Sequence, residues 1–381
     1  MADEERSSKK KHGLIRILIS LAFLVSLSFI SVALISGRGF NFGWLTNFFQ
    51  TDTYYEITDE LFFNVGRGKV FADLETSIAA AGSLGVQVLS YDGSENFRVP
   101  MTMSSPAIAS QNRHAIAFDI GGTDALVFND SGVVASIIAD GPIVSGSINQ
   151  NGWFTVDAQP GGGYRGNTVV YDNRGRPVYR VHMSTGYILS SVLSPDNSIL
   201  AILNLTEYGN RITFYHGLDR PYDDGSFELS SGLILDIHFL SNNDLLAITT
   251  DSLILIDPQG ASGWEIYRFS DMRIGGYEIG SNYIVLYLLD FGIGHRGKII
   301  IIDHFGNLFG EIITDREVIS MSLSEEHLSV MLSDGLILLD KSLNPLPLSA
   351  DNPSAAGVSQ IIALRDKITL VAGERFAIIV R

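Results

Sequence analysis

The sequence predicts an all-β protein, a β-propeller of eight four-stranded blades that follows one N-terminal transmembrane helix, with seven blades as the alternative. Two strand markers recur about every 40 residues, and one uncharged apolar stretch lies near the start of the chain. From these observations we expect a cytoplasmic tail at 1–16, a transmembrane helix at 17–36, a juxtamembrane linker at 37–59 and the propeller at 60–381.

The composition indicates a folded chain that avoids nucleic acid. Of the 381 residues, 46% are hydrophobic and 18% are charged, which is enough to bury a large core. The absence of cysteine excludes disulfides, thiolate metal sites and a cysteine nucleophile. The net charge is -16, and residues 37–381 carry 21 basic against 39 acidic side chains. Because such a chain repels phosphate backbones, we expect no nucleic-acid partner.

The stretch from Ile17 to Ser36 is long enough to cross a membrane. It holds 20 residues without a charge, and a helix of that length spans the hydrocarbon core, which is roughly 30 Å thick. Five basic side chains precede the stretch and Arg38 follows it. The positive-inside rule therefore places the N-terminus in the cytoplasm and the propeller outside, anchored in the cell membrane by a single span.

A cleaved signal peptide is the alternative for the same stretch. Ser31 and Ala33 are small residues at the spacing that signal peptidase prefers, so cleavage near Ala33 would release a secreted protein. The apolar run continues past Ala33 to Ile35 and is longer than the usual apolar region of a signal peptide. This length favours retention of the anchor.

A strand followed by a tight turn recurs along the chain. In "VVYDNRGRPVYRV", Asp172 and Gly175 take the first and fourth positions of a type I turn between two apolar strands. Successive copies lie 37, 43, 43, 42, 46, 37 and 40 residues apart, which is the period of propeller blades. The apolar residues that end the strand before each turn are Tyr91, Phe128, Tyr171, Phe214, Ile256, Ile302, Leu339 and Ile379.

A second marker, a polar turn before an apolar strand, recurs in step with the first. Examples are "SPDNSILAIL" (194–203) and "SNNDLLAI" (241–248). Two markers at one period predict four antiparallel strands in each unit. Their order is strand A, polar turn, strand B, variable loop, strand C, Asp-type turn and strand D.

The two ends of the repeat region are expected to meet. The last unit supplies strands A, B and C, and "ELFFNV" (60–65) is an unassigned strand before the first unit. We expect this segment to pair outside "FAIIVR" (376–381), because closure removes exposed strand edges. Strand A of the first unit, "KVFADL" (69–74), is the least regular, which keeps seven blades open.

The repeat resembles the WD40-like and quinoprotein-like β-propellers, and more closely a family of single-pass, membrane-anchored propeller proteins of Gram-positive bacteria. The resemblance covers roughly residues 60–381 and rests on repeat geometry, so it implies a fold rather than an activity. No blade ends in the Trp-Asp pair of WD40 repeats. Quinoprotein dehydrogenases use repeated tryptophans and a cysteine pair, whereas this chain has Trp44, Trp153 and Trp264 and no cysteine.

No sequence motif indicates catalysis, a metal ion or a cofactor. The eight histidines lie on different predicted blades without the spacings of metal ligands, and no nucleophile elbow or phosphate-binding loop occurs. Turn geometry explains the repeated Asp and Gly without calcium. We therefore expect no metal and no cofactor. A pair of carboxylates that folding brings together stays open as a hydrolytic alternative.

Binding residues are expected on the longest loops, which join strands B and C at 157–167, 204–211 and 289–298. In a propeller these loops share one face with the connections from strand D to strand A. Aromatic and cationic side chains on that face are typical of interfaces. The candidate binding residues are Tyr164, Arg165, Tyr208, His295 and Arg296. The alternative is that these Gly-rich loops are tolerated insertions.

The sequence favours a non-catalytic module of the cell envelope. Such a propeller would be held outside the membrane and would bind an envelope protein or a wall polymer through its B–C loops. The alternative is an enzyme, either a hydrolase or a divergent dehydrogenase, with its site in the propeller channel. Converging carboxylates in the channel would favour the enzyme. A sensor that signals through the tail at 1–16 is a third option.

Overall fold

The computed structural model describes residues 57–217, 222–229, 232–292, 294–348, 353–365 and 368–380. All of them belong to one compact unit, Tyr54–Arg381. The predicted tail, the predicted transmembrane helix and most of the predicted linker lie outside the described residues. Within the described ranges, no helix is long and apolar enough to cross a membrane.

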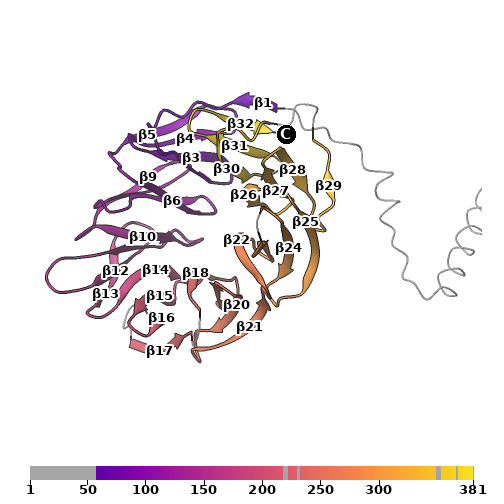
Figure 1. Ribbon diagram of the computed structural model, residues 1–381. Coiled ribbons are helices and arrows are strands. Elements are labelled where there is room, and N and C mark those ends of the chain that lie inside the picture. The colour runs from indigo at the N-terminus through magenta and orange to yellow at the C-terminus, as the bar shows by residue number, and fades with distance from the viewer. Residues whose placement is uncertain are drawn as a thin grey trace, which may run out of the picture. The chain divides into compact units, whose positions relative to one another are not determined.

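The fold consists of eight antiparallel sheets of four strands each, which confirms the eight-bladed propeller (Figure 1). Blade 1 contains β2 (Val70–Asp73), β3 (Ser77–Gly82), β4 (Gly85–Ser90) and β5 (Glu95–Pro100), and blade 2 contains β6 (Pro106–Gln111), β7 (His114–Asp119), β8 (Asp124–Asn129) and β9 (Gly132–Ile138). Blade 3 contains β10 (Ile143–Ile148), β11 (Phe154–Ala158), β12 (Gly166–Tyr171) and β13 (Pro177–Met183), and blade 4 contains β14 (Tyr187–Leu193), β15 (Ile199–Thr206), β16 (Gly209–His216) and β17 (Tyr222–Glu228). Blade 5 contains β18 (Ile234–Phe239), β19 (Leu245–Thr249), β20 (Ser252–Asp257) and β21 (Ser262–Arg268). Blade 6 contains β22 (Met272–Ile279), β23 (Tyr283–Asp290), β24 (Gly297–Asp303) and β25 (Leu308–Thr314). Blade 7 contains β26 (Val318–Leu323), β27 (Leu328–Leu332), β28 (Gly335–Leu339) and β29 (Pro345–Leu346). Blade 8 contains β30 (Val358–Ala363), β31 (Thr369–Gly373), β32 (Ala377–Val380) and, as its outer strand, β1 (Ile57–Glu60).

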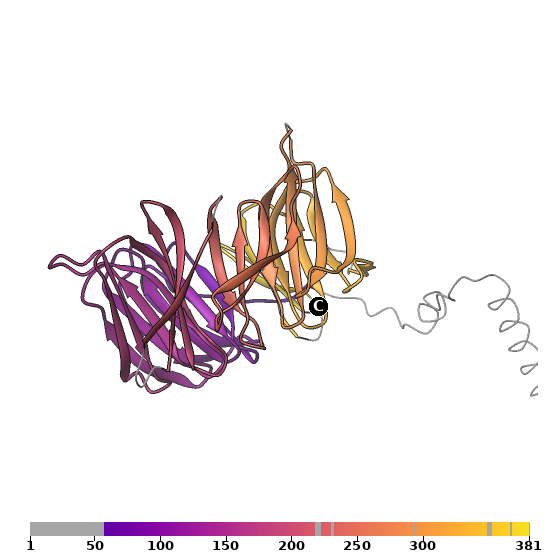
Figure 2. The same ribbon diagram turned by 90° about the horizontal axis from the view of Figure 1, so that it is seen from below.

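The first strand of each blade, strand A, lies nearest the axis of the ring. Strands β10, β14, β18, β22, β26 and β30 surround the centre in Figure 1. Neighbouring A strands contact each other, as β10 contacts β14 and β26 contacts β30. The least regular predicted strand, "KVFADL", forms β2 and is strand A of blade 1. Figure 2 shows the same propeller after a rotation of 90° about the horizontal axis.

Apolar side chains fill the spaces between neighbouring blades. Between blades 5 and 6, Leu246, Ile248 and Leu255 of blade 5 pack with Leu286 and Ile300 of blade 6. Strands B and C are covered on both faces, because each blade has a neighbour on either side. This double burial explains why these strands read as nearly continuous apolar runs.

The repeated turn between strands C and D has the predicted geometry. In blade 3, Gly175 N donates to Asp172 O at 2.9 Å, and the Asp172 carboxylate accepts hydrogen bonds from the backbone N–H groups of Arg174 and Arg176. Gly175 has a φ of 76°, a conformation that L side chains rarely adopt. Asp303 forms the same turn in blade 6. The recurring Asp and Gly are turn residues.

The ring closes between the two ends of the propeller. β1 pairs antiparallel with β32, and Leu61 N donates to Ala377 O at 2.7 Å. The predicted closure is confirmed, but the bounds predicted for its strand, "ELFFNV", are wrong, because the pairing strand ends at Glu60. Leu61, Phe63 and Val65 are instead buried in an apolar cluster between blades 8 and 1. Their burial takes the chain away from the edge of blade 8.

A polar bridge also joins blades 8 and 1. Gln360 of β30 accepts a hydrogen bond from Phe71 N at 3.0 Å and donates one to Phe71 O at 2.8 Å. The side-chain amide thus satisfies both backbone groups of Phe71 in the neighbouring inner strand.

We expect Gln360→Leu to destabilise the propeller. The leucine leaves the N–H and C=O of buried Phe71 without these partners, and a buried unpaired polar group costs about 1–3 kcal/mol. Urea unfolding of the full-length chain, followed by circular dichroism, measures the loss. Ser359→Ala, at the exposed neighbouring position, is the control and should change the unfolding free energy by less than about 0.5 kcal/mol. Equal stability of Gln360→Leu and wild type would contradict the role of the bridge.

Candidate functional site

The five predicted binding residues lie at the same end of their blades, which we call the B–C face. Tyr164 and Arg165 lie between β11 and β12 of blade 3, and Tyr208 lies in the turn between β15 and β16 of blade 4. His295 and Arg296 lie between β23 and β24 of blade 6. The loop predicted at 204–211 is a two-residue hairpin turn, because β15 and β16 extend further than predicted.

Blades 3 and 4 carry an aromatic group on this face. Arg165 Nη1 donates to Tyr187 Oη at 2.7 Å, and the guanidinium carbon lies 5.4 Å from the centre of that ring. The ring of Tyr164 stacks on His182 with 4.6 Å between ring centres. Tyr164, Tyr187 and Tyr208 are 48%, 47% and 87% exposed. We call Tyr164, Arg165, His182, Tyr187 and Tyr208 the aromatic patch.

Two members of the aromatic patch were not predicted. His182 lies in strand D of blade 3, and Tyr187 begins strand A of blade 4. The connection from strand D to the next strand A shares its face with the B–C loops. The repeat predicts where strand D ends and the next strand A begins, so the residues beside this connection could also have been chosen as candidates.

His295 and Arg296 form a separate group on blade 6. His295 Nε2 lies 3.9 Å from Glu317 Oε2, and Arg296 Nε lies 3.5 Å from Asp290 Oδ2. Blade 5 separates them from the aromatic patch along the ring. The structure thus places Tyr164, Arg165 and Tyr208 on adjacent blades and leaves the two blade 6 residues apart, each facing a carboxylate.

A β-bulge recurs in the A strands of blades 3 to 8. In blade 4, Ile188 pairs with Asn204 and Ser190 pairs with Leu203, so Leu189 is an extra residue without a partner. The register shifts at the corresponding place in all six blades, and the extra residues are Val144, Leu189, Leu235, Gly275, Ile319 and Ser359. A bulge re-aims its side chain, here on the strand nearest the axis.

Four of the extra residues are aliphatic, and we call Val144, Leu189, Leu235 and Ile319 the axial collar. Leu235 is 47% exposed, although Ile234 beside it is buried. Leu189 and Ile319 are exposed as well. The bulge therefore sets apolar side chains in water around the axis, towards the B–C face.

Four titratable side chains follow the bulges in the A strands of blades 5 and 6. Asp236 Oδ2 lies 2.8 Å from His238 Nε2 and accepts a hydrogen bond from Tyr277 Oη at 2.6 Å. Asp236 Oδ1 accepts from the backbone N–H of Ile237 at 2.8 Å. Glu278 follows Tyr277 in β22. Both oxygens of Asp236 are therefore engaged within the protein.

The surroundings move the two carboxyl pKa values in opposite directions. Burial raises the pKa of Glu278 to about 7, although a hydrogen bond from Leu323 N and the charge of His238 oppose the rise. Burial also disfavours the ionised form of Asp236, but the hydrogen bonds and charge of its partners outweigh it and lower the pKa. Glu278 can thus exchange a proton near neutral pH.

Asp236 with His238 and Tyr277 is the best location for the enzyme alternative, whereas Glu278 accepts its hydrogen bond from Leu323 N of blade 7. In the part of the chain that the structure describes, no three His, Cys, Asp or Glu side chains are placed to hold a metal ion.

A buried carboxyl group lies between blades 3 and 4, on the strands that carry the aromatic patch. Asp157 Oδ1 accepts a hydrogen bond from Thr168 Oγ1 at 2.6 Å, and Ser191 Oγ lies 2.8 and 2.9 Å from the two carboxyl oxygens. Asp157 has no exposed surface. Burial raises its pKa to about 6, and the hydrogen bonds limit the rise.

We expect Asp157→Asn to stabilise the protein more at pH 7.5 than at pH 4. The pKa of an unfolded aspartate is 3.8, so between that pH and about 6 the folded state holds a proton that the unfolded state has lost. As the pH rises through this window, the free energy of unfolding of the wild type should therefore fall by about 3 kcal/mol. Asparagine is neutral at every pH and removes this loss.

Urea unfolding of both chains at the two pH values tests the expectation. Asp124→Asn changes an exposed carboxylate of blade 2 and is the control. A stability difference between Asp157→Asn and wild type that stays the same at both pH values would contradict it.

The structure is similar to solved propellers over most of its length. For the C-terminal WD40 domain of Sif2, the TM-score is 0.59 at 14% identity, covering 87% of this chain and 99% of that one. For BamB from Moraxella catarrhalis, the TM-score is 0.51 at 11% identity, covering 86% and 99%. For the dihydro-heme d1 dehydrogenase NirN in complex with DHE, it is 0.54 at 16% identity, covering 81% and 70%. These likenesses support the WD40-like and quinoprotein-like fold, and at such low identity they show the fold alone.

No curated protein matches the chain in sequence. A family model does match, over residues 50–342, and its description is "Family of unknown function (DUF5711)". The matched range runs from before β1 to the end of β28, so it contains seven inner strands and the segment that closes the ring. Because it covers well over half of the chain, the protein belongs to this family.

Proposed function

We propose that the protein is a non-catalytic binding module of the cell envelope, which holds a protein partner or a wall polymer on its B–C face. The observation that carries the proposal is the aromatic patch, with three exposed tyrosines on two adjacent blades. Tyrosine and arginine are among the side chains most enriched where binding energy is concentrated.

Contacts within the aromatic patch hold it ready for a partner. Tyr187 is fixed by Arg165 on one side, and Tyr164 is fixed by stacking on His182. A partner therefore gains contact area without first ordering these side chains, which lowers the entropic cost of binding. Tyr208, at the tip of a hairpin turn, adds a second tyrosine of blade 4 to the patch.

The axial collar extends the apolar surface towards the axis on the same face. Leu189 of the collar lies two residues after Tyr187 in β14, so the patch and the collar are joined by one strand. An apolar surface edged by polar groups marks interaction sites in soluble proteins. A partner that covers blades 3 and 4 would also reach this surface.

The charge of the chain narrows the class of partner. Residues 37–381 carry 39 acidic and 21 basic side chains, so polyanions such as nucleic acids are repelled. A neutral or basic polypeptide, or a wall polymer that carries amino groups, fits this charge.

Anchoring in the membrane is part of the proposal. It rests on the uncharged stretch Ile17–Ser36 and on the basic residues before it, as in the single-pass propeller proteins of Gram-positive bacteria that the repeat resembles. In this arrangement the tail at 1–16 is cytoplasmic and the propeller faces outward.

We expect the aromatic patch to retain a partner. Tagged full-length protein is purified from native membranes in mild detergent, and co-purifying material is identified by mass spectrometry and sugar analysis. The triple variant Tyr164→Ala, Arg165→Ala and Tyr208→Ala should retain at least about tenfold less partner, the loss typical of truncated binding hot spots. The double variant His295→Ala and Arg296→Ala is the matched control on blade 6 and should retain wild-type amounts.

Circular dichroism spectra of the variants must match the wild type for this comparison. If both variants lose the partner equally, binding involves the whole B–C face rather than the aromatic patch. If wild type and triple variant retain the same partners, the proposed patch is wrong. If nothing co-purifies with wild type, the binding function fails and the Asp236–His238–Tyr277 group is the first place to look for an activity.

We expect protease added to intact, wall-stripped cells to degrade the propeller and to spare the N-terminal tail. The physical reason is the excess of basic residues before the apolar stretch. Tags at the two ends of the chain, followed by immunoblotting, report each part. Survival of the propeller with loss of the tail would reverse the topology, and recovery of the propeller in the medium would indicate cleavage near Ala33.

A further inference from the structure

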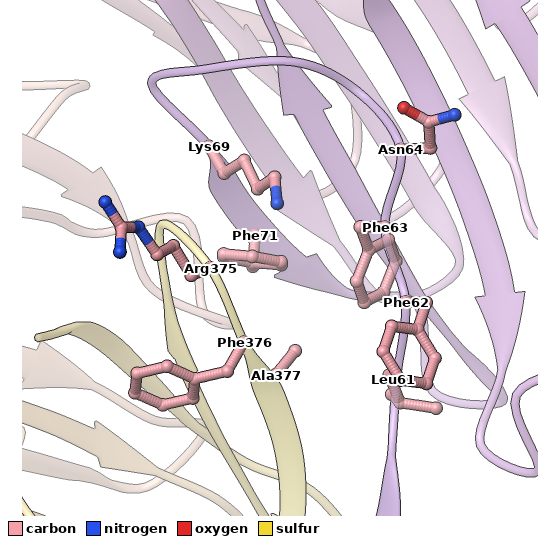
Figure 3. Close-up of a pocket in the computed structure, with 9 residues that line it drawn as sticks. All are labelled: Leu61, Phe62, Phe63, Asn64, Lys69, Phe71, Arg375, Phe376 and Ala377. Carbon is pink, nitrogen blue, oxygen red and sulfur yellow. The ribbon is translucent and has the colours of Figure 1, made fainter.

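A pocket of about 220 Å³ lies where the ring closes. Its walls come from the segment after β1, from the start of blade 1 and from the turn between β31 and β32 of blade 8 (Figure 3). It therefore opens at the B–C end of blades 8 and 1, away from the aromatic patch of blades 3 and 4. No motif in the sequence indicated it.

The walls of this closure pocket are mainly phenylalanine. Phe63 and Phe71 meet edge to face, with 5.4 Å between ring centres, and both are buried. Phe62 is 74% exposed, an unusual position for so large an apolar side chain. Leu61, Phe376 and Ala377 complete the apolar lining.

Two cationic side chains border the same pocket. In Figure 3, Lys69 extends towards the space between Phe71 and Phe63, and Arg375 lies on the opposite strand turn. Lys69 Nζ donates to the backbone oxygen of Glu374 at 2.9 Å, which fixes its position and leaves two N–H donors. The backbone N–H groups of Gly68 and Lys69 hold the Glu374 carboxylate at 3.2 and 3.4 Å.

One carboxylate near the pocket, that of Glu374, is bound by backbone N–H groups rather than by the ammonium of Lys69 or the guanidinium of Arg375. Among the described residues, neither side chain takes part in an ion pair. Two cationic side chains outside ion pairs, beside an apolar pocket, can bind a ligand of opposite charge.

We propose that the closure pocket binds a small amphipathic anion, an aromatic or short aliphatic body that carries one carboxylate. The body would lie against Phe62, Phe63 and Phe71, and the carboxylate would accept hydrogen bonds from Lys69 and Arg375. A cavity of about 150 Å³ lined by apolar side chains holds a benzene ring, so this pocket has room for the ring and its acid group. This inference goes beyond the proposed function, which concerns blades 3 and 4.

Such a ligand would couple to closure of the ring. Phe62 and Phe63 follow β1 directly, whereas Arg375 and Ala377 belong to the end of the ring that β1 completes. A ligand that contacts both sides holds them together and stabilises the folded state by mass action.

Benzoate is the probe, titrated into the full-length chain in detergent by calorimetry, with a detergent blank. We expect saturable binding with a dissociation constant on the order of 1 mM, as for a ligand of this size, and a rise of the thermal unfolding midpoint. Benzyl alcohol and benzylamine, which lack the carboxylate, should bind at least about tenfold more weakly. Absence of saturable benzoate binding would overturn the proposal, as would equal binding of benzyl alcohol.

Three variants assign the binding to the pocket. Lys69→Met and Arg375→Gln each remove one cation and should weaken benzoate binding about tenfold, and Phe62→Ala removes an exposed wall and should weaken it as well. Arg174→Gln removes the same charge from an exposed turn of blade 3 and is the matched control. Loss of binding in the control as large as in Lys69→Met would assign the effect to overall charge and overturn the site. Phe62 and Arg375 have exposed side chains, so these variants stay informative if Lys69→Met unfolds.

Discussion

Pairing of β1 with β32 is the constraint on which the rest of the propeller depends. Without β1, blade 8 would have three strands and β32 would present an open edge, the kind of edge that recruits other chains. The pairing also fixes the first and last blades side by side, so that every inner strand has two neighbours. The closure pocket exists because these two ends of the ring meet.

Closure makes a small change in each blade add up to a shared surface. Six A strands contain one extra residue each, and four of these residues are aliphatic. The A strands of blades 1 and 2 pair without such a bulge, so the collar is incomplete on that side. The closure pocket lies at the junction of blades 8 and 1. The B–C face therefore carries the axial collar on one part of the ring and the closure pocket on another.

The sequence predicted the repeat well because strands B and C are buried on both faces and the turns need Asp and Gly. It misplaced the closing strand because Leu61, Phe63 and Val65 alternate as in a strand, although they fill the core between two blades. The collar depends on pairing register, which a single strand does not reveal. The aromatic patch depends on Tyr187, which only the fold brings to Arg165. The repeat predicted the positions of the B–C loops, but it did not predict which loop residues would contact each other.

Hydrogen bonds between blades join particular neighbours, which apolar packing alone does not do. Apolar side chains fill the interfaces between blades, and apolar contact is not directional. The hydrogen-bonded pairs differ: Tyr277 with Asp236 between blades 5 and 6, Ala363 N with Ser322 between blades 7 and 8, and Phe71 with Gln360 between blades 8 and 1. Each pair is satisfied only when the correct neighbours meet, and a buried polar group left unpaired is costly. We infer that these links, rather than the larger apolar area, select which blade follows which.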